Sequence, residues 1–239
     1  MNNNHLTDLD HWNEYWSNYQ YDKVPKKVVF SKFTERLSKG KSLIEIGGFP
    51  GINAGYFYNK GVKDISILDF HMNTNIVRKF ELFNQIPQDT IKCIHSDFFK
   101  FTPSRTYDIV FSCGFAEHFH NTEETIQRHI DLLSKEGQLL ILIPNFLGLN
   151  GALQRRFDKP NLDAHNLKSM QPDFLKEIMQ KSGLKNYSVE YVGKPMVWLE
   201  PKSENMKYLK SVKLLSYFIK LFPIKGRFLS PYIAIYASK

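Results

Sequence analysis

The chain has 239 residues, of which 42% are hydrophobic and 14% aromatic, and its formal net charge is +8. This length and apolar content predict a folded globular protein with a sizeable core. No run of about 18 apolar residues exists, so no membrane-spanning helix is expected, and the polar first ten residues are unlike a secretory signal. Two cysteines, Cys93 and Cys113, cannot build a disulfide framework or a zinc cluster. They fit a reducing cytosol, so a cytoplasmic protein is expected.

The first predicted element is a helix over residues 11–21 with an aromatic face. Four residues stand at helical spacing on this face: Trp12, Tyr15, Trp16 and Tyr19. The face predicts a packing surface, which is the commoner role, or a lid over a ligand site. A second helix is expected over residues 28–37, leading into the first strand.

Residues 42–51 predict a buried strand, a tight glycine turn and the start of a helix. The strand is apolar apart from Glu45 near its end. Three glycines follow it: Gly47, Gly48 and Gly51. Glycine lets the backbone approach a ligand closely and a helix start presents free N–H groups, so a nucleotide-like ligand fits here. The spacing of a dinucleotide-binding fingerprint is missing, because Phe49 and Ile52 stand where that fingerprint has glycine.

The stretch from Glu45 to Gly51 resembles the first motif of the class I S-adenosylmethionine-dependent methyltransferases, an acidic residue followed by x-Gly-x-Gly-x-Gly. Phe49 replaces the middle glycine, and Gly48 is displaced by one position. The resemblance implies an α/β fold, with a doubly wound, mostly parallel, seven-stranded Rossmann-like sheet whose last strand is antiparallel. It also implies S-adenosyl-L-methionine as cofactor. A glycine turn that binds no ligand is the alternative that this motif alone leaves open.

Acidic residues end the next two predicted strands, over residues 64–70 and 91–98. The Asp69 carboxylate can accept hydrogen bonds from both ribose hydroxyls of a nucleoside, or it can cap the helix that follows. Asp97 and the adjacent Phe98 suit an adenine. The carboxylate can accept a hydrogen bond from the adenine amino group, and the Phe98 ring can contact the flat face of the base. Together with Glu45, these acids at successive strand ends favour a bound ligand over an empty turn.

Residues 107–113 predict the fourth strand, which a Glu-His pair follows. The segment resembles the methyltransferase pattern Asp-x-Val-x-Ser-x-x-x-x-Glu-His, through Asp108, Val110, Ser112, Glu117 and His118. A helix is expected over residues 122–133. Residues 132–145 then resemble the turn and fifth strand of the same family, although of the usual Pro-Gly-Gly only the last glycine, Gly137, is present. The implied cofactor site comprises Glu45, Gly47, Gly48, Gly51, Asp69, Phe70, Asp97, Phe98, Ser112 and Cys113.

Beyond residue 145 the resemblance holds only in outline. Residues 146–170 lack periodicity and are expected to be an irregular segment that covers the substrate. A helix over residues 172–182 and strands over residues 186–192 and 232–237 complete the fold. The whole chain is expected to be a single methyltransferase domain, 1–239, with a lid or packing segment at 1–38, a cofactor-binding core at 40–145 and a substrate-side segment at 146–239.

A hydroxyl acceptor must lose its proton, so a general base is expected near the methyl group. His118 is the first candidate, because it follows the fourth strand at the carboxyl edge of the sheet. His165 and Asp163 are the alternatives, and capping or packing at a helix terminus is the other role for His118. Glu117, His118 and His120 lack a defined metal-ligand spacing, so no metal site is expected.

The expected reaction is O-methylation of a small molecule, a glycan or a lipid-linked intermediate, as in polysaccharide biosynthesis. Nucleic acid is disfavoured as acceptor, because residues 112–115 lack the Asn/Asp-Pro-Pro-aromatic motif typical of base amino methylation in this fold. An inactive scaffold with the same fold is the first alternative, favoured by the altered glycine motif. Another nucleotide-dependent α/β enzyme is the second, disfavoured by the missing dinucleotide spacing.

The basic residues concentrate in the last part of the chain, where residues 202–239 carry +7 of the net charge of +8. A helix over residues 204–222 would place Lys210, Lys213 and Lys220 on one sector. The opposite sector would hold Val212, Leu215, Phe218, Ile219 and Phe222. Such a helix can lie on an anionic membrane, or, more commonly, pack its apolar face on the sheet or on a second subunit. The oligomeric state stays open.

Overall fold

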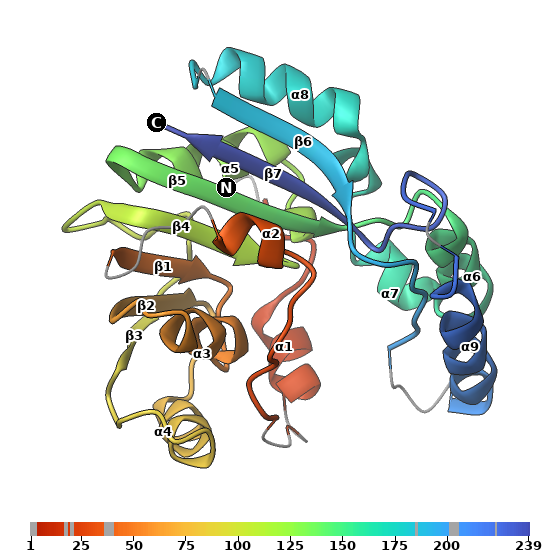
Figure 1. Ribbon diagram of the computed structural model, residues 1–239, viewed down its shortest axis with the longest axis horizontal. Helices are drawn as coiled ribbons and strands as arrows, with labels where there is room; N and C mark the ends of the chain where they lie inside the picture. The colour runs from red at the N-terminus through yellow and green to blue at the C-terminus, as the bar shows by residue number, and fades with distance from the viewer. Residues whose placement is uncertain are drawn as a thin grey trace.

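The computed structural model describes residues 4–16, 19, 22–35, 41–184, 186–200, 206–222 and 224–239. A seven-stranded sheet organises these residues, with strand order β3-β2-β1-β4-β5-β7-β6 (Figure 1). The strands are β1 Ser42–Ile46, β2 Asp64–Asp69, β3 Ile91–His95, β4 Tyr107–Cys113, β5 Leu133–Pro144, β6 Asn186–Val192 and β7 Tyr232–Ser238. Strand β7 runs antiparallel to both β5 and β6, and the other pairs are parallel. The predicted fold, with its antiparallel last strand, is confirmed.

Helices cover both faces of this sheet. They are α1 Leu9–Trp16, α2 Ser31–Thr34, α3 Ile52–Asn59, α4 Thr74–Phe83, α5 Thr122–Asp131, α6 Leu149–Phe157, α7 Lys159–Asp163, α8 Pro172–Lys181 and α9 Met206–Ile219, with 3-10 turns η1 Ala116–His118 and η2 Leu167–Met170. None of the described helices is long and apolar enough to cross a membrane. The N-terminal helices are shorter than expected, and residues 17, 18, 20, 21 and 36–40 lie outside the described residues.

Alternate residues of the central strands bury their side chains on opposite faces, as a pleated strand requires. Leu43 of β1 and Ile109 of β4 join an apolar cluster with α3 and α4. Ile44 and Val110, one position further on each strand, join a second cluster with α5 and α8. Burial on both faces explains why the strands read as continuous apolar runs.

Local signals fix several element boundaries. Asn73 is the N-cap of α4, and its side-chain oxygen accepts hydrogen bonds from the backbone N–H groups of Asn75 and Ile76. Because Asn73 caps this helix, Asp69 is left free for another role. Strands β4 and β6 have the predicted boundaries.

The expectation of an irregular segment over residues 146–170 is wrong. This segment forms α6, α7 and η2. Helices α6, α7 and α9 gather beyond one end of the sheet (Figure 1). Helix α9 packs against α6 through Val212 and Ile219, not against the sheet. We call α6, α7 and α9 the helical lobe.

Candidate functional site

A cavity of about 480 Å³ lies outside the carboxyl ends of β1, β2, β4 and β5. The sequence order of the strands runs outward in both directions from β1, so the cavity sits at the point where ligands bind in doubly wound sheets. Its volume falls within the range of about 300–1,000 Å³ that is typical of ligand sites.

The glycine turn after β1 forms the floor of this cavity. Gly47 has a positive φ of 67°, and a Cβ atom there would lie 2.5 Å from the Phe115 ring. A Cβ atom on Gly48 would lie 2.8 Å from Glu45 and 2.9 Å from Ile67. Close packing therefore requires glycine at the displaced position. Gly51 begins α3 in a left-handed conformation and does not line the cavity.

Glu45 is buried at the cavity end of β1 and faces α3. The Asn53 side-chain amide donates a hydrogen bond of 2.9 Å to Glu45 Oε1. Glu45 Oε2 has no hydrogen-bond partner among the described residues. Burial raises the pKa of Glu45 to about 8, so the group is mostly protonated at neutral pH and can donate a hydrogen bond.

A pH dependence of stability follows from the shifted pKa of Glu45. The native pKa is about 8, against the ordinary value of 4.5. Between these values the native state holds a proton that the unfolded chain has released, so stability falls as pH rises, by at most about 1.4 kcal/mol per pH unit. Glu45→Gln removes this loss. In urea unfolding at pH 6 and pH 8, the variant should gain stability relative to wild type at the higher pH. An unchanged difference at the two pH values, as expected for the exposed control Glu136→Gln, would contradict the assignment.

Asp69 lies at the end of β2, beside the glycine turn. Its two carboxylate oxygens accept hydrogen bonds from the backbone N–H groups of Phe49, at 3.0 Å, and His71, at 2.9 Å. Burial raises the pKa of Asp69 to about 6. The carboxylate lines the cavity, and each of its oxygens keeps a lone pair that a ligand hydroxyl can use.

The side chains expected at an adenine are only partly brought together. Phe70 and Phe98 line the cavity, whereas Asp97 lies outside it. Asp97 Oδ1 accepts a hydrogen bond from Phe99 N, at 2.9 Å, and lies 3.5 Å from His5 Nε2. The His5 ring packs 5.8 Å from the Phe70 ring. The N-terminal segment therefore covers the position where an adenine is expected.

Ser112 and Cys113 differ in their access to the cavity. Ser112 is buried, lies outside the cavity lining, and its Oγ lies 3.1 Å from His129 Nε2. Cys113 lines the cavity, and burial raises its pKa far above the usual range. The thiol is therefore protonated and contributes a small apolar surface rather than a nucleophile.

Glu117, His118 and His165 meet at the side of the cavity beyond β4, and we call them the acceptor-side cluster. Ligand atoms of the three side chains all lie within 4.8 Å of one another. Burial lowers the pKa of His118 to about 3 and that of His165 to about 4, and raises the pKa of Glu117 to about 8. All three groups are therefore mostly uncharged at neutral pH. His120 is exposed and does not join them.

Hydrogen bonds to backbone carbonyls set the tautomer of both histidines. His118 Nδ1 lies 3.0 Å from Ala164 O, and His165 Nδ1 lies 2.5 Å from Asn161 O. A carbonyl only accepts, so each Nδ1 carries the hydrogen and each Nε2 keeps its lone pair. The cluster therefore presents two hydrogen-bond acceptors of fixed orientation.

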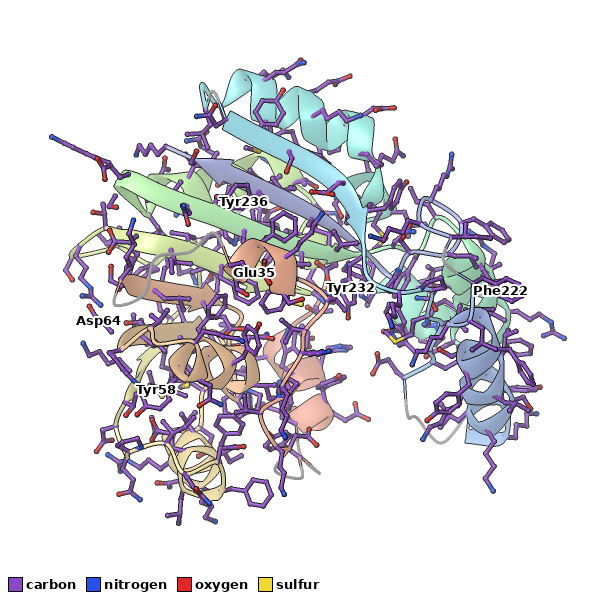
Figure 2. All side chains as sticks on the ribbon, in the orientation of Figure 1. Glu35, Tyr58, Asp64, Phe222, Tyr232 and Tyr236 are labelled. Carbon is purple, nitrogen blue, oxygen red and sulfur yellow. The ribbon has the colours of Figure 1, made fainter. Side chains whose placement is uncertain are left out.

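Aromatic residues close the cavity. From α1, Trp12, Tyr15 and Trp16 line it, and the Trp12 ring lies 5.1 Å from the His118 ring. This position agrees with a lid over the site. Trp198 and Tyr232 also line it, with ring centroids 5.9 Å apart. Figure 2 shows Tyr232 where β7 meets the helical lobe.

The sequence analysis did not place several lining residues in the site: Asn53, Phe146, Asn161, Trp198, Glu200 and Tyr232. Only Asn53 carried a usable signal, because it stands in the first turn of the helix after the glycines. The others come from segments that resemble the family only in outline.

Comparisons with known proteins agree with this geometry. A family model described as a methyltransferase domain matches residues 15–189. The structure is similar to that of an S-adenosylmethionine-dependent methyltransferase from Archaeoglobus fulgidus, with 18% identity, TM-score 0.57, and 88% of this chain and 91% of that chain covered.

Two further solved structures are similar in fold. A Thermotoga maritima S-adenosylmethionine-dependent methyltransferase, described as a possible histamine N-methyltransferase, has 13% identity and TM-score 0.59, and covers 97% of this chain and 95% of its own. The plantazolicin methyltransferase BpumL, in complex with S-adenosylhomocysteine, has 15% identity and TM-score 0.59, with coverage of 98% and 92%. Among curated proteins, none matches the sequence.

Proposed function

Because this chain belongs to the methyltransferase-domain family, whose members use S-adenosylmethionine, we propose that it transfers the methyl group of that cofactor to a hydroxyl of a small-molecule, glycan or lipid-linked acceptor. The observation that carries the proposal is that one cavity holds both Asp69 and the acceptor-side cluster. The carboxylate suits the ribose of the cofactor, and the uncharged histidines suit an acceptor hydroxyl.

The cofactor part of the cavity runs along the ends of β1 and β2. Asp69 accepts hydrogen bonds from the ribose hydroxyls, and Phe70 and Phe98 contact the adenine. The protonated Glu45 and the backbone of Gly47 and Gly48 face the methionine portion. This arrangement directs the methyl group past the end of β4, toward the acceptor-side cluster.

The chemical step is an in-line displacement. The acceptor oxygen forms a bond to the methyl carbon while the carbon–sulfur bond breaks, and the bonding electron pair stays on sulfur as S-adenosylhomocysteine. The hydroxyl loses its proton as this bond forms. His118 Nε2 or His165 Nε2 accepts the proton and then releases it to water. Holding the hydroxyl in line with the methyl group supplies much of the rate acceleration.

An oxygen acceptor is favoured over a protonated amine. At neutral pH the acceptor-side cluster bears no net charge, so it offers no counter-ion to an ammonium group. Its two lone pairs on Nε2 can accept a hydrogen bond from a neutral hydroxyl. Incubation with S-adenosylmethionine carrying a labelled methyl group, and with a panel of glycans, quinols and amino sugars, tests this. Label on oxygen is expected, and label on nitrogen would overturn the O-methylation proposal.

The helical lobe carries a basic and apolar surface that suits an acceptor held in an anionic membrane. Exposed apolar residues follow the outer side of α9 and the residues after it: Leu214, Tyr217, Phe218, Leu221, Phe222 and Ile224, each more than half exposed. Lys210 and Lys213 are exposed on the same helix, and Lys220 is exposed directly after it. Phe222 lies in the lobe, away from the sheet (Figure 2). Lysines would contact lipid headgroups while the aromatic rings enter the interface.

Liposome sedimentation tests this membrane surface. We expect the protein to bind vesicles that contain anionic lipid and to dissociate as salt rises, because the attraction is screened over about 10 Å at 0.1 M. Phe218→Ser combined with Leu221→Ser should reduce binding. A matched control, Leu82→Ser with Phe83→Ser, changes exposed apolar residues of α4 and should not. Failure to bind anionic vesicles at low salt would remove the membrane surface from the account.

A further inference from the structure

We propose that Glu117, His118 and His165 form a binding site for one divalent transition-metal ion, with Zn²⁺ or Mn²⁺ as the ions that suit it. The inference rests on the proposed function only for the role of the ion, which is to hold the acceptor hydroxyl. Binding of the ion itself requires neither cofactor nor acceptor.

The donor set and its spacing carry the inference. One ligand atom from each of the three side chains lies within 4.8 Å of the others, and His118 Nε2 lies 3.9 Å from Glu117 Oε1. Ligand atoms of one zinc ion each lie about 2.0–2.2 Å from it, so two of them are at most about 4 Å apart. A small inward rotation of the side chains reaches this spacing. Two imidazoles and one carboxylate are a donor set of catalytic zinc sites.

The hydrogen bonds of both histidines match those of metal ligands. Each imidazole uses Nδ1 to donate to a backbone carbonyl, of Ala164 or of Asn161. The lone pair on Nε2 is then held in a fixed direction, which is the usual arrangement around a bound metal. These carbonyls belong to α7 and the residue after it, so the fold rather than a mobile side chain orients the rings.

The buried carboxyl group of Glu117 lacks a partner that would justify its burial. The Glu117 side chain is 1% exposed, and its Oε2 atom has no hydrogen-bond partner among the described residues. An unpaired buried polar group costs free energy, whereas a cation would give the carboxylate a partner. Asn166 holds the two parts of the site together, because its N–H donates a hydrogen bond of 2.7 Å to Glu117 O.

Three protein ligands leave coordination positions open on the side of the cavity. An acceptor hydroxyl would occupy one of them, and coordination would lower its pKa. Because both Nε2 lone pairs would then bind the ion, the hydroxyl proton would pass directly to solvent water rather than to a histidine. Mg²⁺ prefers oxygen ligands, so the two imidazoles favour Zn²⁺ or Mn²⁺ over it. The sequence analysis weighed Glu117, His118 and His120 and expected no metal site from them; in the set proposed here His165 is the third ligand instead of His120.

Calorimetric titration of the full chain with Zn²⁺ or Mn²⁺ alone, after dialysis against a chelator, tests the site. Wild-type protein is expected to bind one equivalent. Glu117→Gln and His165→Ala should each weaken binding by about 10–100-fold or more. His120→Ala, which changes an exposed histidine outside the site, should leave the affinity unchanged. His165→Asp restores a ligand and should bind more tightly than His165→Ala.

Circular dichroism and titration with S-adenosylhomocysteine establish that each variant is folded. Absence of binding of both ions to wild type would overturn the inference, as would equal affinity in wild type, Glu117→Gln and His165→Ala. S-adenosylhomocysteine binding without metal binding would refute the metal site and leave the proposed function standing. Metal binding without S-adenosylhomocysteine binding would refute the proposed function alone.

Discussion

Replacing His165 with alanine is expected to lower the rate of methyl transfer by about 10²–10⁴-fold, the range for loss of a group that assists proton removal. Affinity for S-adenosylhomocysteine should be nearly unchanged, because His165 lies at the acceptor side of the cavity and Asp69 lies in its cofactor part. Single-turnover rates and calorimetry on the same preparation separate the two effects. His118→Ala is expected to behave in the same way.

The double variant distinguishes a shared role from two separate ones. In the proposed reaction the two histidines act together on one hydroxyl, so losing both should cost little more than losing either. His120→Ala is a suitable control, since the His120 side chain is exposed and outside the cavity. Near-wild-type rates in both single variants would contradict a role of the acceptor-side cluster in the reaction.

Replacing Asp69 with alanine is expected to weaken S-adenosylhomocysteine binding strongly. Each hydrogen bond from a ribose hydroxyl to the buried carboxylate contributes about 1.5–3 kcal/mol, or roughly ten- to a hundredfold in affinity. The substitution also removes the acceptor for the Phe49 and His71 N–H groups, which hold the glycine turn in place. Both losses act in the same direction.

Two matched variants separate these contributions. Asp69→Asn keeps one acceptor oxygen and should lose less affinity than Asp69→Ala. Asp97→Ala removes an acid of the neighbouring strand end that lies outside the cavity, so it should have a smaller effect than Asp69→Ala. Equal affinity in wild type and Asp69→Ala would refute the ribose assignment.

The sheet could be predicted from the sequence because its signals are local. Buried strands read as apolar runs, glycines and the Asn73 cap mark their connections, and acids stand at the strand ends. Helix α6 could not be predicted, because it buries polar residues that satisfy groups far away in the chain. Gln154 Nε2 donates to Trp198 O at 2.8 Å, and Asn150 Oδ1 accepts from Trp198 N at 3.1 Å. A buried polar residue breaks the apolar pattern that reveals a helix.

The cofactor residues and the acceptor-side cluster also differ in how far the sequence predicts them. The sequence predicts that Glu45 and Asp69 share a site, because both stand at the ends of parallel strands and these ends meet at one edge of the sheet. The sequence does not predict that Glu117 and His165 lie together. Long-range hydrogen bonds join η1 to the turn after α7, such as the one from Asn166 N–H to Glu117 O. Sequence proximity pointed to His120, whereas tertiary packing turns that side chain to solvent. Trp198 and Tyr232 likewise come together only through tertiary packing of segments that are far apart in the sequence.

A crystal structure of the S-adenosylhomocysteine complex tests the central claim most directly. The account predicts the ligand in the cavity at the ends of β1, β2 and β4, with its ribose hydroxyls hydrogen-bonded to Asp69 and its sulfur facing His118 and His165. A ligand bound outside this cavity, or bound within it with the sulfur directed away from these histidines, would contradict the account.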